Sequence, residues 1–482
     1  TVGGTACGQA FIMRYCSPYY HRSFLLPIVP GLSEFIKAKK SSKNPNTVSG
    51  GLKHHYLPKD KGVRRMTYRW RNMPQWIERT LQITDFVGEG IRKLLSCFSD
   101  FWKQGKAFPE PNRILIIRCD YIGDLLLTTP ALLALRRRFP NAHITVLAQP
   151  AATPILRANP NIEEVISLLP VWLDRNQTLP YHDPKPLRRW LGIITWHWRC
   201  CKAAYEVGKQ LRARQFDLAI DFRGDPRHAL LMAAAKIPVR IGCANGGWAF
   251  LLTHPVPSNE DAHEIDRCLG IIQVLGADTE DRKPFLKCFR EDELSVREKL
   301  RHQGVTDEDL LVVIHPSAGD RAREWNAKAW AKVADALIHG EEVKVVLNGT
   351  AGERPKIEAI KTYMREKAID LCGQLTLSEL ISLLKRCDLL LTVNSGPMHI
   401  AAVLGTPMVV VWAASWRVQN WGPYGHNHII IQKQVPCANC WLAKCPKPIS
   451  CMDMIEPEEV IDAAIKKLQE IKAIKKGARK DE

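Results

Sequence analysis

The segment Cys387–Trp412, CDLLLTVNSGPMHIAAVLGTPMVVVW, gives the chain its clearest architectural signal. Its apolar run Leu389–Val393 has the length of a buried strand, and the Asn-Ser-Gly-Pro sequence at 394–397 ends that strand in a tight turn. Met398–Leu404 then continues as a helix, because proline suits a first helical turn, and Met408–Trp412 is the next strand. A strand, a turn, a helix and a strand in this order predict a βαβ unit of a parallel sheet.

The turn of this unit is a candidate anion site. Backbone N–H groups and a helix N-terminus point beyond the carboxyl end of the strand, where a phosphate is the most plausible ligand. Ser395 and Gly396 lie in the turn, and His399 in the first helical turn adds a side-chain donor. The alternative, a turn and a core helix that bind nothing, stays open from this unit alone.

Length and composition indicate a large globular protein. The chain of 482 residues suits two domains, with 46% hydrophobic and 24% charged residues. It holds no apolar run near the roughly 18 residues of a membrane span and no signal-peptide pattern, so we expect an intracellular protein. Most of the 15 cysteines stand singly, which is typical of a reducing compartment.

The net charge of +18 lies in two attachments to an otherwise neutral chain. Residues 1–106 hold 18 Lys and Arg against 6 Asp and Glu, and residues 170–214 hold 9 against 3. We expect residues 1–65 to be mostly disordered and residues 74–102 to form a basic amphipathic helix. Such a helix either lies on an anionic membrane or packs on the body, and both alternatives stay open.

The second attachment interrupts a pattern of alternating strands and helices. It carries Trp172, Trp190, Trp196 and Trp198 among basic residues. Interleaved tryptophan and arginine suit a membrane surface. They also occur in nucleic-acid binding, but no motif for DNA or RNA accompanies them, so we expect no nucleic-acid partner.

The part of the chain around this insertion predicts a doubly wound α/β domain. Strands are expected at Arg113–Arg118, His143–Ala148 and Val165–Leu168, and after the insertion at Phe216–Asp221 and Val239–Gly242. Asp124 follows the first strand in a turn that opens a helix. A carboxylate there can face a cleft, although an acidic residue also suits a helix N-terminus for its dipole alone.

The second half of the chain alternates in the same way. Strands are expected at Leu310–Ile314, Val343–Leu347 and Ile369–Leu371, before the opening βαβ unit. After the first of them, Ser317 and Arg323 stand in a glycine-containing loop where side chains and N–H groups could grip a phosphate.

Four segments together resemble a known family. They are IRCDYIGDLLLTTPALLALRRRFP, HPSAGDRAREWNAKAWAKVAD, LCGQLTLSELISLLKRCDLLLTVNSGPMHIAAVLGTP and CANCWLAKCPKPISCMDMIEPEEVIDA. In this order they resemble the family 9 glycosyltransferases, the ADP-heptose:lipopolysaccharide heptosyltransferases. The resemblance implies a GT-B fold, with two Rossmann-like doubly wound domains facing a central cleft. We expect a basic extension at 1–107, an acceptor domain at 108–290 with the insertion at 170–214, and a nucleotide-sugar domain at 291–482.

The resemblance also implies roles for individual residues. Asp124 matches the aspartate proposed as general base, which takes the proton of the acceptor hydroxyl. Arg323 stands where the family usually has lysine and keeps the cation that offsets charge on the leaving diphosphate. Glu353 lies near the acidic residue that holds the nucleoside ribose, and His399 matches the donor-phosphate turn.

One departure from the family pattern concerns the donor sugar. Asn394 stands where many members have aspartate, immediately before Ser395 and Gly396 of the phosphate turn. An amide still bonds to sugar hydroxyls but carries no charge, so the identity of the donor sugar stays open.

Four cysteines near the end of the chain raise the question of a metal. Cys437, Cys440, Cys445 and Cys451 have a spacing that is compatible with four thiolate ligands for zinc. The resemblance implies no required metal or other cofactor, because the family shows similar cysteines without a known metal. An unligated or redox-variable loop is the other interpretation.

The expected function is inverting transfer of a heptose or related sugar from an ADP-sugar to a lipopolysaccharide core or other lipid-linked glycan. Its partners would be the donor, an anionic lipid A–core acceptor and an anionic membrane, which puts the protein on the cytoplasmic face of the inner membrane. The alternative is a GT-B relative such as a nucleotide-sugar epimerase or a non-catalytic nucleotide-sugar-binding protein. An epimerase needs no membrane acceptor, so the basic attachments favour the transferase.

Overall fold

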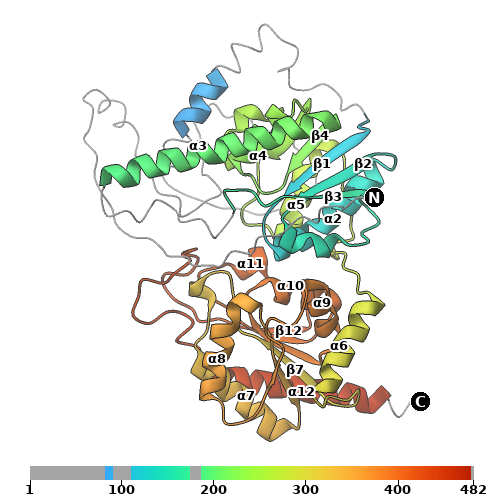
Figure 1. Cartoon of the computed structure of the whole chain (residues 1–482), viewed down its shortest axis with the longest axis vertical. Coiled ribbons are helices and arrows are strands. Elements are labelled where there is room, and N and C mark those ends of the chain that lie inside the picture. Colours follow the sequence, from blue (N-terminus) through green and yellow to red (C-terminus); the bar gives the residue numbers. More distant parts are fainter. Residues whose placement is uncertain (1–81, 91–109, 174–185, 479–482) are drawn as a thin grey trace, which may run out of the picture. The chain divides into compact units, whose positions relative to one another are not determined.

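The computed structural model describes residues 82–90, 110–173 and 186–478 (Figure 1). The segment expected to be disordered, 1–65, lies outside these residues. Of the helix expected over 74–102, residues 82–90 are described and are helical. Both sheets described below belong to one compact unit, so the domain boundaries expected at 107 and 290 remain predictions.

The first sheet has six parallel strands in the order β3-β2-β1-β4-β5-β6. They are β1 (Arg113–Arg118), β2 (His143–Ala148), β3 (Glu164–Ser167), β4 (Leu218–Asp221), β5 (Val239–Cys243) and β6 (His254–Val256). This order reverses direction between β1 and β4. In open parallel sheets, ligands bind at such a switch point, beyond the carboxyl ends of the strands.

Helices cover both faces of this sheet because its strands are apolar on both sides. Ile114 and Ile116 pack in the core cluster that includes α2 (Ile122–Arg138) and α5 (Glu264–Ile272). Leu115 and Ile117 face the cluster that includes α3 (Pro186–Leu211) and α4 (Pro226–Ala234).

The second sheet repeats this topology, with the order β12-β11-β10-β7-β8-β9. Its strands are β7 (Leu311–His315), β8 (Lys344–Leu347), β9 (Ile369–Asp370), β10 (Leu389–Val393), β11 (Met408–Val411) and β12 (His428–Ile431). The helices are α6 (Arg290–His302), α7 (Ala327–Glu341), α8 (Arg354–Tyr363), α9 (Leu377–Arg386), α10 (Gly396–Leu404), α11 (Val418–Trp421) and α12 (Pro457–Ala478). Here the switch point lies between β7 and β10.

The α/β class and the two doubly wound parallel sheets expected from the sequence are confirmed. The opening βαβ unit is β10, α10 and β11, and Gly405 ends α10 with a left-handed φ of 77°. Two edge strands, β6 and β12, were not predicted: β6 has three residues, one of them proline, and no strand pattern of its own.

No secondary structure was predicted for the basic, tryptophan-rich insertion at 170–214, but most of it is the 26-residue helix α3. Ile193, Cys200 and Ala204 are buried on the side of α3 that contacts α4. Among the helices in the described residues, none is both long enough and apolar enough to span a lipid bilayer.

Candidate functional site

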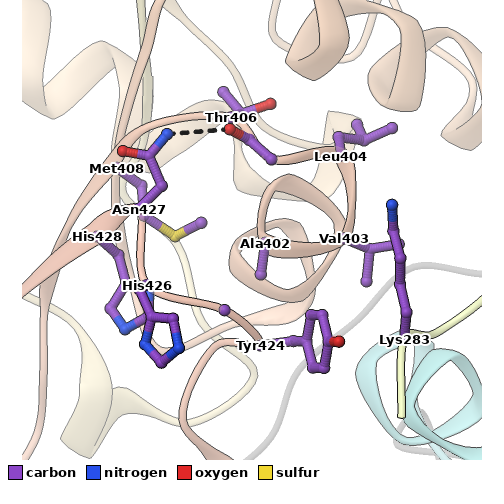
Figure 2. A pocket seen from close by; sticks show the side chains of 12 residues that line it. Lys283, Ala402, Val403, Leu404, Thr406, Met408, Tyr424, His426, Asn427 and His428 are labelled. Carbon is purple, nitrogen blue, oxygen red and sulfur yellow. Dashed lines mark hydrogen bonds between the residues drawn. The ribbon is translucent and has the colours of Figure 1, made fainter. Parts of the chain in front are cut away.

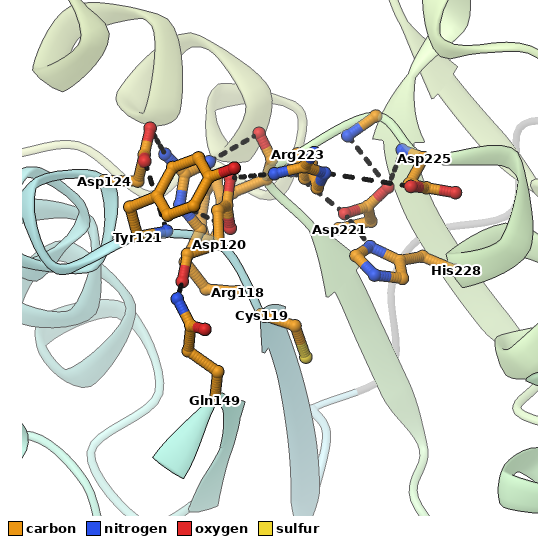
Figure 3. Close-up of polar contacts among 12 residues, drawn as sticks. Arg118, Cys119, Asp120, Tyr121, Asp124, Gln149, Asp221, Arg223, Asp225 and His228 are labelled. Carbon is orange, nitrogen blue, oxygen red and sulfur yellow. Dashed lines mark hydrogen bonds and ion pairs between the residues drawn. The ribbon is translucent and has the colours of Figure 1, made fainter. Parts of the chain in front are cut away.

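Charged side chains gather at the switch point of the first sheet (Figure 3). Asp124 is the third residue of α2, which follows β1, and Arg223 lies in the turn after β4. Because β1 and β4 are neighbours that end at the same sheet edge, their following turns meet there. Asp124 is thus positioned by the end of β1 and the start of α2 at the sheet edge where open α/β sheets commonly bind ligands.

Asp124 is largely enclosed, with 13% of its side chain exposed. Its Oδ1 lies 3.4 Å from Nη2 of Arg118, and its Oδ2 accepts a hydrogen bond from the Tyr121 backbone N–H at 3.3 Å. Burial, and then the nearby negative charge of Asp120, raise the pKa of Asp124 to about 6. At neutral pH the carboxylate is therefore ionised and holds its proton more readily than an ordinary aspartate, as a general base requires.

Arg118 is fully buried and is shared among several acceptors. Its Nη1 donates to the Phe222 carbonyl at 2.9 Å, and its Nη2 donates to Glu264 at 2.6 Å. Arg267 also donates to Glu264 and to the same carbonyl. Two guanidinium groups therefore fix Glu264 of α5 beneath the first turn of α2.

A second carboxylate, Asp120, stands in the turn between β1 and α2. Its side chain is 3% exposed and lies 3.2 Å from Nη1 of Arg223 and 3.5 Å from Nε of Arg118. Arg223 is 12% exposed and also lies 3.7 Å from Asp225. Asp120 thus joins the two arginines that flank Asp124.

Arg323 and Ser395, two of the residues expected to bind the donor, lie at the switch point of the second sheet. Arg323 follows β7 in a short 3-10 turn, and its Nη1 donates to the backbone carbonyl of Asn394 at 3.0 Å. Its Nη2 pairs with Asp320 at 2.8 Å, and its guanidinium lies over the Trp416 ring at 5.0 Å. Ser395 is the N-cap of α10 but makes no side-chain cap bond. The structure thus brings Arg323 to the turn that precedes α10, which is the turn expected to bind a phosphate.

His399 of α10 lies against the first turn of α2. A Cβ built on Gly123 would lie 2.6 Å from Cδ2 of His399, so this ring packs on the backbone next to Asp124. Burial, and then His263 and Arg323, lower the pKa of His399 to about 3. The imidazole is neutral at pH 7, and its Nδ1 is buried without a hydrogen-bond partner among the described residues. His399 therefore offers a neutral donor where the two sheet edges meet.

The remaining expected donor residues have different surroundings. Ser317 is 1% exposed, and its Oγ has no hydrogen-bond partner among the described residues. The Oδ1 of Asn394 lies 3.4 Å from the Ala413 N–H. Glu353 accepts bonds from the backbone N–H and the hydroxyl of Thr350, at 2.7 and 3.0 Å, as a helix cap. Glu353 therefore has a structural role in addition to the ribose contact expected of it.

The four cysteines line one pocket of about 210 Å³ together with Ala322 and Ser415. The loop that carries them is hydrogen-bonded to the segments that follow β7 and β11, since the Ala322 N–H donates to Ala443 at 2.9 Å and the Trp441 N–H donates to Ser415 at 3.0 Å. Within the described part of the chain, no group of three or more His, Cys, Asp or Glu side chains is arranged to hold a metal ion. The spacing that is compatible with zinc does not produce such an arrangement here. These cysteines are Cys437, Cys440, Cys445 and Cys451.

Another pocket, of about 260 Å³, lies at the other end of α10 (Figure 2). Leu404, Tyr424, His426 and Lys283 are among its lining residues. The phosphate turn precedes the first residue of α10, and this pocket adjoins the last, about 13 Å away along a nine-residue helix. It is therefore separate from the donor turn.

Sequence reasoning missed the buried charges around Asp124. Asp120 and Arg118 could have been noticed as charged residues at the end of a buried strand. Glu264 lies 146 positions after Arg118, and both Glu264 and Arg267 reach the site only through the tertiary fold.

Comparisons with known proteins bear on the family and the fold of this chain. The model of glycosyltransferase family 9 (heptosyltransferase) matches residues 204–449. The chain is 29% identical to lipopolysaccharide heptosyltransferase 3 of Escherichia coli K12, over 64% of this chain and 84% of that protein. A family 9 glycosyltransferase from Veillonella parvula is similar in structure, with a TM-score of 0.61, 22% identity and coverage of 74% and 98% of the two chains. The E. coli ADP-heptose lipopolysaccharide heptosyltransferase II is also similar in structure, with a TM-score of 0.56 and 20% identity. The similarity covers 74% of this chain and 99% of that chain. The GT-B fold expected from the sequence is confirmed.

Proposed function

Since the chain belongs to glycosyltransferase family 9 and is a glycosyltransferase, we propose that it transfers a heptose from ADP-heptose to a lipopolysaccharide core. A related sugar and another lipid-linked glycan fit the same chemistry. The observation that carries this proposal is the contact of His399 with Gly123, next to Asp124. It supports a single site that joins a base on the first sheet to an anion-binding turn on the second.

The chemistry of the proposed reaction follows from these positions. Asp124 accepts the proton of the acceptor hydroxyl as that oxygen attacks the anomeric carbon, and the configuration at this carbon inverts. Charge grows on the leaving ADP as the glycosidic bond breaks. Arg323, the N-terminus of α10 and the neutral His399 N–H offset that charge.

Other residues would orient the donor. Ser317 has a buried hydroxyl without a partner among the described residues, so it is available for a phosphate or sugar oxygen. Asn394, Ser395 and Gly396 present an amide, a hydroxyl and backbone N–H groups. We assign Glu353 to the ribose of the nucleoside, and we assign the reaction no metal.

A membrane-bound acceptor fits a second feature, the exposed side of α3. Leu191, Ile194, Trp198 and Tyr205 are each at least 46% exposed there. Lys202 lies 5.2 Å from the Trp198 ring. Apolar and aromatic groups beside cations suit the interface of an anionic membrane.

The helical segment 82–90 has a similar outer side. Asp85 accepts a bond from the Ala249 N–H at 3.1 Å, whereas Ile83 and Phe86 are 65% and 83% exposed. We infer that both helices contact the cytoplasmic face of the inner membrane as peripheral elements.

The test is incubation with ADP-heptose and a deacylated lipid A–Kdo acceptor, with product detected by mass. Transfer of one heptose supports the proposal, and its loss in Asp124→Asn assigns the product to this site. Conversion of the nucleotide-sugar without acceptor would indicate an epimerase. Binding of ADP-heptose without any conversion would indicate a non-catalytic binding protein.

A further inference from the structure

Two aspartates of the β1–α2 turn share their cationic surroundings (Figure 3). Arg118 lies 3.5 Å from Asp120 through Nε and 3.4 Å from Asp124 through Nη2. Arg223 approaches Asp120 to 3.2 Å through Nη1. Asp120 is the more deeply buried carboxylate, with 3% of its side chain exposed against 13% for Asp124.

Arg118 and Arg223 form their shorter described ion pairs with carboxylates other than Asp124. The shortest ion pair of Arg118 is with Glu264, at 2.6 Å, and Arg223 pairs with Asp120 and Asp225. Among the described residues, the only ion pair of Asp124 is the 3.4 Å contact with Arg118. A close bidentate arginine would occupy both carboxylate oxygens and lower their affinity for a proton.

We propose that Asp120 is a positioning residue: it holds Arg118 and Arg223 in place and so keeps Asp124 available as the proton acceptor. This inference rests on the proposed function, in which Asp124 is the base. It assigns a role to a second carboxylate that does not itself touch the reacting atoms.

Asp120 also acts through its own charge. Burial is the first cause of the raised pKa of Asp124, and Asp120 is the second, while Arg118 opposes them. Without Asp120, the like charge is lost and the arginines can turn toward Asp124, so both effects lower its pKa. The charged or titratable groups around Asp124 are Arg118, Asp120, Tyr121, Arg223, His263, Glu264, Arg267 and His399.

The test is the acid limb of the pH dependence of kcat/KM in Asp120→Asn. We expect this limb to move to lower pH by about one unit, since a neighbouring charge typically shifts a pKa by ~1–3 units. We also expect slower turnover at neutral pH, because a weaker base is a poorer proton acceptor. Asp120→Glu keeps the charge and should keep the limb near its original position.

The matched control is Asp217→Asn. Asp217 accepts bonds from the Asn112 and Arg113 N–H groups at the opposite ends of β1 and β4. It is a carboxylate of the same strand pair, and its loss should change stability without moving the limb. A folded Asp120→Asn with an unmoved limb overturns the proposal.

A second variant keeps the test valid if Asp120→Asn does not fold. Arg223→Gln removes a cation that lowers the pKa of Asp124, so the limb should move to higher pH; an unmoved limb in this variant also overturns the proposal. If the wild type transfers no sugar, the proposed function fails. The carboxyl titration of Asp124 is then followed by infrared difference spectra against Asp124→Asn, and an apparent pKa that Asp120→Asn leaves unchanged overturns the positioning role separately.

Discussion

Nη2 of Arg118 lies 2.6 Å from Glu264 but 3.4 Å from Asp124. This nitrogen of a buried cation therefore contacts Glu264 more closely than Asp124, the less deeply buried of the two carboxylates. The shorter pair joins the end of β1 to α5, whereas burial and then Asp120 raise the pKa of Asp124 to about 6 against the opposing charge of Arg118.

Asp124→Asn should lower turnover by roughly 100-fold or more, because a positioned base typically contributes ~10²–10⁴. ADP affinity should stay unchanged, since the donor turn lies on the second sheet. Steady-state kinetics with calorimetry on the same preparation measures both quantities. Near-normal turnover in the variant would remove Asp124 from the role of base.

The same substitution should stabilise the protein at neutral pH. Folding raises the pKa of Asp124, so its stabilising contribution is present below about pH 4 and is lost as pH rises through about 6. Asparagine stays neutral throughout. We expect a gain on the order of 1–3 kcal/mol in the free energy of unfolding near neutral pH, which vanishes below about pH 4. Urea unfolding of wild type and variant near neutral pH and below about pH 4 measures this difference. A variant that is no more stable than wild type near neutral pH would contradict the expected stabilisation.

Arg323→Ala should weaken ADP binding more than His399→Ala does. A charge-assisted hydrogen bond from Arg323 contributes roughly 1.5–3 kcal/mol. The low pKa of His399 makes it a neutral donor, for which roughly 0.5–1.5 kcal/mol is expected. Calorimetry with ADP measures both values.

Arg321→Ala is the matched control for this pair. Arg321 belongs to the same short turn as Arg323 but is exposed. Its loss should leave ADP affinity within a few tenths of a kcal/mol, as for other surface substitutions. Equal affinity in the wild type and in both site variants would place the phosphate elsewhere.

Gly123→Ala should displace His399, because the new Cβ would lie 2.6 Å from the ring. Turnover should fall, and the effect should not add to that of His399→Ala, since contacting residues couple. Gly270→Ala in α5 is the control, as its Cβ would meet no atom within 4 Å. A double-mutant cycle measures the coupling, and fully additive losses would argue against a functional contact.

The inner strands of both sheets were predictable because each carries its own apolar run. The run Leu389–Val393 was predicted with the bounds that β10 has, and the turn chemistry of residues 394–397 located the start of α10. The edge strand β6 was missed because three residues that include a proline give no periodic signal.

The site was predictable only where its residues follow strands. Asp124 and Arg323 stand at the carboxyl ends of β1 and β7, so topology located them. The pairing of Arg118 with Glu264 joins residues 146 positions apart and depends on how α5 packs. Nor could spacing show that His399 is buried deeply enough to be neutral, because its pKa depends on neighbours from both sheets.

The outer side of α3 should bind anionic vesicles. Each Lys or Arg near such a surface, Lys202 among them, contributes about 1 kcal/mol before screening, and the Debye length is about 8 Å at physiological ionic strength. We therefore expect flotation with anionic vesicles at low salt and partial release at high salt. Combined Leu191→Gln, Ile194→Gln and Trp198→Gln should reduce flotation but leave activity on a soluble, deacylated acceptor largely intact. Leu294→Gln on α6, where the leucine is 54% exposed, is the matched control and should float normally. Wild-type protein that stays in solution with the vesicles, or a triple variant that binds them as strongly, would exclude α3 as the lipid contact.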